Sequence, residues 1–175
     1  MKHLFVLFAL LLVFPPTAHS EGLDGYPCKK VWSRVGEFEF LESCSYDGVD
    51  YEICIEAPLK GMTRGTWYFY NNWGNDADVP LPGVAATGPQ DAIVVGGLSV
   101  FSTHSGDIIA REISILNWDL YVEYFALSTL EEVIGGTGRY EGAIGWLGVV
   151  ASEVEGGILT GEVCGPNVRF HPRFK

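Results

Sequence analysis

The sequence has few of the residues that bind metals, phosphates or nucleic acids. Once a predicted signal segment at the N-terminus is removed, only His104 and His171 remain, and they lie at no ligand spacing. We therefore expect no metal site.

The same part of the chain holds ten Lys and Arg against 22 Asp and Glu, a formal charge of −12. Such a surface repels phosphate backbones and anionic lipid, which excludes nucleic-acid binding and argues against a membrane partner.

Long apolar runs are absent beyond the N-terminus. Residues 4–14 are uninterruptedly apolar, with Lys2 before them and Pro15-Pro16 after them. The run is about half of what a membrane-spanning helix requires, and it is typical of a secretory signal peptide. Ala18 and Ser20 are small residues that suit cleavage before Glu21. We expect residues 1–20 to be removed and residues 21–175 to form one secreted domain, extracellular or periplasmic.

Cysteine is scarce, but its four residues all lie in the mature part: Cys28, Cys44, Cys54 and Cys164. An even number in an exported chain predicts disulfides, and no Cys-x-x-Cys redox motif is present. If Asp47-Gly48 is a two-residue hairpin turn, Cys44 faces Tyr51 and Cys54 faces Leu41, so a Cys44–Cys54 bridge needs a bulge. The other option ties Cys28 or Cys44 to Cys164 and joins the first strand to the last. The pairing stays open.

What the chain does contain is a series of alternating, aromatic-rich and glycine-punctuated runs. These predict strands over residues 36–45, 49–57, 66–70, 92–102, 108–116, 120–127, 140–151 and 158–164. A long loop at 71–90 and one helical turn at 128–132 interrupt them. A sheet of short antiparallel strands joined by hairpins loses its exposed edge strands when it closes into a barrel. The sequence therefore predicts an all-β fold, an eight-stranded antiparallel up-and-down β-barrel between about residues 31 and 165.

A cluster of glycines at 135–145 is the most distinctive stretch. Gly136, Gly138 and Gly142 invite comparison with the G-x-G-x-x-G phosphate loop, but the third glycine falls one residue late and no helical pattern follows. A phosphate loop needs a helix N-terminus to bind its anion. We interpret Gly135, Gly136, Gly138, Tyr140 and Gly142 as structural residues of a crowded turn between two strands, with Tyr140 at the end of the barrel.

The same stretch carries a family resemblance. Residues 133–145, V-I-G-G-T-G-R-Y-E-G-A-I-G, resemble the G-G-T-G-[RKD]-[FY]-x-G-A-x-G stretch of the allene oxide cyclase barrel-like and dirigent-like superfamily. Residues 106–111 and 155–161 resemble that superfamily's preceding strand and last hairpin. The resemblance implies a homodimeric or homotrimeric barrel. It also implies that the barrel binds a hydrophobic small molecule and steers its cyclisation or coupling without a cofactor. It covers the C-terminal half of the chain and does not place the family's catalytic residues.

Two charged residues interrupt the apolar faces of neighbouring expected strands. A tight turn at 117–119 would set Arg111 opposite Phe125 and make Arg111 and Glu123 diagonal neighbours on one face. Such a pair is either a satisfied structural ion pair or a catalytic polar centre that orients a ligand. Aromatic residues on these strands and on 66–70 either pack the core or line the ligand site. The expected ligand contacts are Trp67, Phe69, Tyr121 and Phe125.

Two other short stretches bear on the class of function. Ser102, His104, Ser105 and Asp107 crowd one turn and cannot adopt the geometry of a nucleophilic triad, and no Gly-x-Ser-x-Gly elbow is present. Gly65-Thr66-Trp67 resembles the Gly-x-Trp signature of lipocalins, although it follows two strands instead of opening the first. The alternative to a cofactor-free isomerase is therefore a non-catalytic, lipocalin-like binding or structural barrel.

Overall fold

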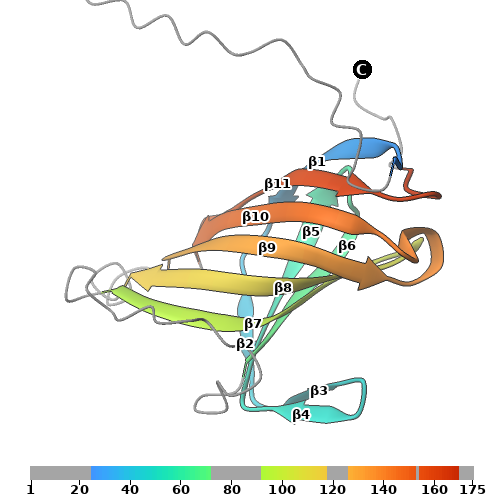
Figure 1. Ribbon diagram of the computed structural model, residues 1–175. Coiled ribbons are helices and arrows are strands. Elements are labelled where there is room, and N and C mark those ends of the chain that lie inside the picture. Colours follow the sequence, from blue (N-terminus) through green and yellow to red (C-terminus); the bar gives the residue numbers. More distant parts are fainter. Residues whose placement is uncertain (1–24, 72–91, 118–125, 153, 170–175) are drawn as a thin grey trace, which may run out of the picture.

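The computed structural model describes residues 25–71, 92–117, 126–152 and 154–169 (Figure 1). These parts contain strands and one short 3₁₀ helix, η1, and no α-helix. The elements are β1 (Cys28–Val35), β2 (Glu39–Leu41), β3 (Cys44–Tyr46), β4 (Val49–Tyr51), β5 (Ile53–Gly61), β6 (Gly65–Asn71), β7 (Ala92–Thr103), β8 (Gly106–Asn117), β9 (Ala126–Gly136), η1 (Gly138–Tyr140), β10 (Ile144–Ser152) and β11 (Gly156–Cys164). In this described part, no helix is long and apolar enough to cross a membrane.

Eight strands close into an antiparallel barrel. The sheet runs β1-β11-β10-β9-β8-β7-β6-β5, and β5 pairs again with β1 through Arg34 and Lys60. From β5 to β11 each strand pairs with the next one in the chain, so the order is up-and-down (Figure 1). Closure joins β1 to β5 at three positions, Ser33 to Val35, and the rest of β1 pairs with β11 alone. The prediction of an all-β, eight-stranded up-and-down barrel is confirmed.

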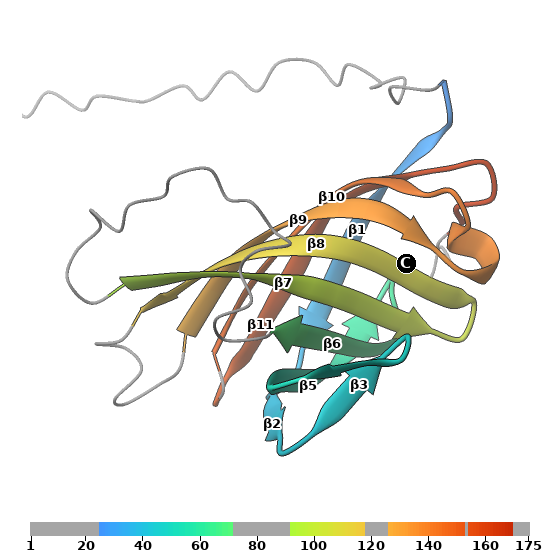
Figure 2. The same cartoon turned by 60° about the horizontal axis from the view of Figure 1, so that its bottom comes forward.

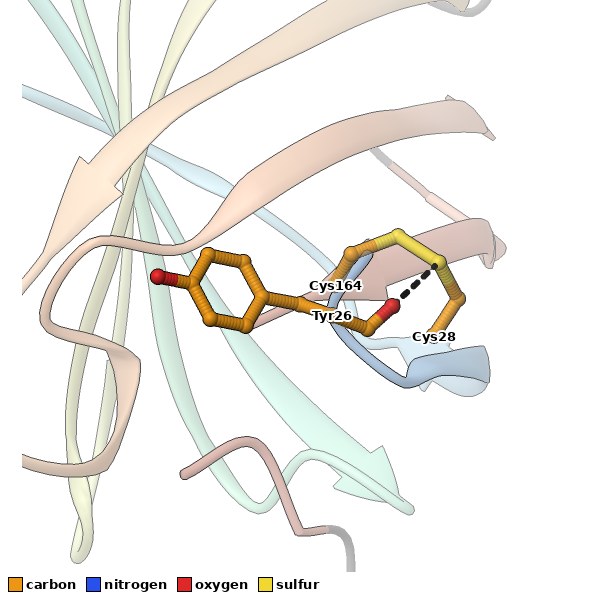
Figure 3. Close-up of a disulfide and its surroundings, with 3 residues drawn as sticks. All are labelled: Tyr26, Cys28 and Cys164. Atoms are coloured by element: carbon orange, nitrogen blue, oxygen red, sulfur yellow. Dashed lines mark hydrogen bonds between the residues drawn. A yellow bond between two sulfur atoms is a disulfide. The ribbon is translucent and has the colours of Figure 1, made fainter. Parts of the chain in front are cut away.

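A disulfide reinforces the point at which the barrel closes. Cys28 and Cys164 occupy directly opposed positions on β1 and β11 and are joined by a bond. Figure 3 shows this bridge beside Tyr26, whose carbonyl oxygen lies 3.7 Å from Sγ of Cys28. Because a disulfide sulfur carries no proton, we describe this approach as a contact and not as a hydrogen bond. The bridge joins positions 136 residues apart, so it constrains most of the chain.

The second disulfide secures a hairpin that lies outside the barrel. Asp47 and Gly48 both have positive φ, 49° and 77°, as a two-residue type I′ turn requires. Cys44 faces Tyr51 and Cys54 faces Leu41, the register that such a turn predicts. The ladder is interrupted between these two pairs and the ribbon bends there. Cys44 therefore reaches Cys54, at a Cα–Cα distance of 6.3 Å, without a bulge.

The hairpin of β3 and β4 covers the outer face of β6 and β7. Tyr70 points outward from β6, and its ring lies 5.4 Å from that of Tyr46 and 5.2 Å from that of Tyr51. Burial and the neighbouring tyrosines raise the pKa of Tyr70 to about 12. Val100 and the buried Cys54 complete this small second core. One side of the barrel is thus covered by the chain's own hairpin (Figures 1 and 2).

Several expected strand boundaries were wrong. Strand β1 was missed, and the two strands expected at 36–45 and 49–57 each divide into two where the hairpin bends. The helical turn expected at 128–132 is the middle of β9, where Thr129 and Glu131 point inward and Leu130 points outward. Because polar residues, Thr129 and Glu131, occupy its inward positions, this run lacks the apolar–polar alternation that predicts a strand. Most of the strand expected at 120–127 and of the loop at 71–90 lies outside the described residues.

The glycine stretch forms the turn between β9 and β10. Gly138 and Gly142 have positive φ, 59° and 69°. A Cβ atom on Gly136 would lie 2.2 Å from the carbonyl oxygen of Asp107, so a larger residue does not fit there. Tyr140, on η1, is buried in the main core at this end of the barrel, which lies to the right in Figure 1.

A buried carboxyl pair inside the barrel

Polar residues replace the apolar pattern on the inward faces of β8 and β9. On β8 the inward positions carry Ile108 and Ala110, and then Glu112 and Ser114. Glu112 lies directly opposite Glu131 of β9. Their exposed fractions are 1% and 0%, so both carboxyl groups lie in the barrel interior. Two buried carboxyl groups on facing positions are uncommon, because each ionised form is costly without partners.

Both oxygens of Glu112 accept hydrogen bonds from hydroxyl groups. Ser114 donates to Oε1 and Ser99, on β7, donates to Oε2. Ser99 itself accepts a bond of 2.9 Å from the indole N–H of Trp67 on β6. That indole has no other donor to offer, so it commits the Ser99 proton to Glu112. Three neighbouring strands thus hold this carboxyl group in one orientation.

Glu131 is satisfied on one side only. Its Oε1 accepts a bond of 2.9 Å from Thr129, and Thr129 in turn accepts one of 2.9 Å from the backbone N–H of Val149 on β10. Within the described residues, Oε2 of Glu131 has no hydrogen-bond partner although it is fully buried. A buried polar atom without a partner requires an explanation, and a catalytic or ligand-binding role is one of the few that apply.

The walls beside the pair are apolar. Gly97 lies opposite Glu112 on β7, and a Cβ atom there would lie 2.3 Å from the ring of Phe69. The glycine therefore makes room for that ring next to the carboxyl group. On the other side, Glu131 faces the fully buried Leu147 of β10. The pair is surrounded by low-polarity side chains, apart from the hydroxyl groups that bind it.

These surroundings change how the two carboxyl groups ionise. Burial raises the pKa of Glu112 from 4.5 to about 7, and the hydrogen bonds from Ser114 and Ser99 offset part of that rise. Burial and the charge of Glu112 raise the pKa of Glu131 further above its usual range, while Thr129 offsets part of it. Because the groups interact, they lose their protons in two separate steps. Glu131 therefore keeps its proton to higher pH than Glu112, and Glu112, whose two donors favour the carboxylate, ionises first.

The residues chosen from the sequence lie in different places. Arg111 is exposed on the outer face of β8, opposite Glu132, so the expectation that it points into the barrel was wrong. Trp67 and Phe69 are buried on the inward face of β6: Trp67 donates to Ser99, and Phe69 lies beside Gly97, the residue paired with Glu112. Glu123, Tyr121 and Phe125 lie outside the described residues, so their roles remain predictions.

The sequence did contain a signal for the pair that was missed. On β8 the even-numbered residues read Ile108, Ala110, Glu112 and Ser114, and the odd-numbered ones looked more apolar. The pattern therefore predicts the odd-numbered face as the interior, whereas it is the outer face. A one-residue error in this assignment exchanges the two faces of a strand, which is why Arg111 was chosen instead of Glu112.

Comparisons with known proteins do not assign the chain to a family. No protein-family model matches the chain, and no match was found among curated proteins or among solved structures. Within the described residues, no group of three or more His, Cys, Asp and Glu side chains is arranged to hold a metal ion. The chemistry proposed for this site therefore rests on the side chains of Glu112, Glu131 and their neighbours.

Proposed function

We propose that this protein is a secreted barrel that binds a hydrophobic small molecule and moves protons on it without a cofactor, as a cyclase or isomerase of the dirigent-like kind would. One observation supports this proposal above the others. Glu112 and Glu131 are opposed inside the barrel, one bound on both oxygens by donors and the other with an unpartnered buried oxygen. This arrangement favours an ionised carboxylate on Glu112 beside a carboxylic acid on Glu131.

Such a pair has the parts needed for a proton-transfer isomerisation. The carboxylate of Glu112 removes a proton from the carbon next to a carbonyl group of the ligand. The proton on Oε2 of Glu131 is donated to the carbonyl oxygen, where negative charge develops. Glu112 then returns its proton to another carbon, and Glu131 recovers its own. No proton is gained or lost overall, and one acid and one base suffice because their environments separate their pKa values.

The class of ligand follows from the neighbours of the pair. Phe69, beside Gly97, and Leu147, opposite Glu131, offer contacts to hydrocarbon, so an uncharged ligand with one hydrogen-bond-accepting oxygen suits the position. An anionic ligand would be repelled by the carboxylate. The two disulfides are consistent with an oxidising compartment. Together with the apolar N-terminal run, they support secretion after removal of residues 1–20.

The second candidate is a barrel that binds or stabilises without turnover. It is favoured by the almost complete burial of both glutamates, which leaves the pair enclosed by its own donors. In that case the network of Trp67, Ser99 and Glu112 holds three strands in register, as buried polar networks can.

The test is carbon-bound proton exchange with a defined probe. A hydrophobic β,γ-unsaturated ketone in D₂O, followed by NMR, reports deuterium incorporation and movement of the double bond. We expect the mature protein to accelerate both, and Glu112→Gln and Glu131→Gln to lose the acceleration. Glu132→Gln is the matched control, since Glu132 is the neighbouring but exposed glutamate and should behave as wild type. Binding of the probe without any exchange would favour the non-catalytic barrel.

A further inference from the structure

We propose that a second copy of this chain docks on the outer face formed by β8, β9, β10, β11 and β1. This face carries a band of exposed large apolar side chains, which we call the outer patch: Trp32, Ile113, Leu130, Trp146, Val150 and Ile158. A contiguous exposed apolar patch on a soluble domain marks an interaction site more often than an accident of composition. The inference is independent of the carboxyl pair and of any activity.

The strand register makes the outer patch continuous. Ile113 lies directly opposite Leu130, and Val150 directly opposite Ile158. Leu130 is two residues from both Ser128 and Glu132, which face Val150 and Trp146, so it is a diagonal neighbour of each. Trp32 faces Thr160, two residues from Ile158. The six side chains therefore form one surface across five strands and not a set of isolated exposures.

The centre of the outer patch is the most exposed part. Val150 and Leu130 retain 65% and 61% of their surface, and Trp146 retains 53%. Side chains of this size are rarely left so exposed together in a monomer. The opposite side of the barrel differs, because the hairpin of β3 and β4 lies over β6 and β7 there (Figures 1 and 2). The chain covers one outer face itself and leaves the other to a partner.

The charges around the outer patch favour a second copy as that partner. The outward positions between its apolar residues carry Lys30, Arg34, Arg111, Glu132 and Glu162, a net charge of +1. The whole chain carries −11, so the remaining surface is strongly acidic and repels another copy. This face is where two identical chains meet with the least repulsion, and a twofold arrangement lets the same patch cover itself.

Barrel closure decides the manner of contact. Since β8, β9, β10 and β11 each pair with a neighbouring strand on both sides, a second copy cannot join this face by adding a strand to it. Face-to-face packing of sheets, about 10 Å apart, remains, and it buries apolar side chains from both partners. Gly148 lies on β10 between Trp146 and Val150 and leaves a flat position at the centre of the patch.

The experiment measures mass against concentration for the mature chain by analytical ultracentrifugation. We expect a dimer with a dissociation constant on the order of 1 μM, maintained or tightened at high salt because salt screens the acidic repulsion. Leu130→Lys and Val150→Lys should each weaken dimerisation at least tenfold with an unchanged circular dichroism spectrum. Because each lysine adds positive charge to a patch whose net charge is already +1, the uncharged variants Leu130→Ser and Val150→Ser should also weaken dimerisation, which repulsion between lysines cannot explain.

Val49→Lys is the matched control, since Val49 is a similarly exposed valine on the separate hairpin. It should dimerise as wild type does. A wild-type chain that stays monomeric at about 100 μM would overturn the inference, as would equal weakening by Val49→Lys. Binding of the monomer to neutral phosphatidylcholine vesicles, lost in Leu130→Lys, would assign the outer patch to lipid and reject the second copy.

Discussion

Replacing Glu112 by Gln should make the barrel less sensitive to alkaline pH. In the native chain the pKa of Glu112 is raised from 4.5 to about 7, mainly by burial. A carboxyl group whose pKa is higher in the folded than in the unfolded state binds its proton more tightly when folded. Its contribution to stability is therefore fully favourable below about pH 4.5 and is lost as pH rises through about 7.

The shift sets the size of the effect. A rise from 4.5 to about 7 corresponds to about 3 kcal/mol of folding free energy lost between acid and mildly alkaline pH. Glutamine keeps the shape of the side chain and can accept from one serine, but it never has to ionise. Relative to the wild type, Glu112→Gln should therefore gain about 3 kcal/mol between pH 5 and pH 8. For a domain of this size that difference is about 6–12 °C in melting temperature.

The assay is urea unfolding at a series of pH values between 5 and 8, on wild type, Glu112→Gln and the exposed control Glu132→Gln. The quantity that matters is the change with pH in the difference between variant and wild type, because it cancels the contribution of the other acidic residues. Parallel pH profiles for wild type and Glu112→Gln would refute the interpretation that this carboxyl group is buried and raised in pKa.

Three further predictions concern the surroundings of the pair and the closure of the barrel. Trp67→Phe removes the donor to Ser99 but keeps an aromatic ring, and should cost about 1–3 kcal/mol by chemical denaturation; a neutral result would show that the indole N–H is not needed. Gly97→Ala places a methyl group 2.3 Å from the ring of Phe69 and should cost about 1–3 kcal/mol, with a crystal structure showing a displaced ring. Cys28→Ser removes the bridge across 136 residues and should cost up to about 5 kcal/mol, and unchanged stability would mean that the first strand is held by pairing alone.

The architecture was largely accessible from the sequence because it depends on short-range patterns. Alternating runs, turn residues and the Asp47-Gly48 hairpin predicted an eight-stranded barrel, and the register of that turn was correct. The position of β1 was not accessible in the same way. Its residues Lys29, Lys30 and Arg34 look like loop residues, and they form a strand because β11 and a disulfide hold them in the barrel.

The site could not be predicted correctly, because it depends on which face of β8 points inward. Ile113 and Ile115 made the outer face look like the core, although both are exposed. Glu112 and Glu131 looked like surface residues, and only the tertiary pairing of β8 with β9 brings them together inside. The apolar outer face of β8 and the polar inner pair therefore both led to the wrong choice of inward face. These two exceptions to the usual pattern are also the features on which the proposed dimer interface and the proposed active site rest.

The most direct test of the central claim is an NMR titration of the glutamate side-chain carboxyl groups after selective ¹³C labelling. The carboxyl pair predicts one resonance that titrates near pH 7 and a second that stays protonated at higher pH, assigned by their loss in Glu112→Gln and Glu131→Gln respectively. If every glutamate in the protein instead ionises with a midpoint near its ordinary value of about 4.3, the barrel holds no buried acid–base pair and the account is contradicted.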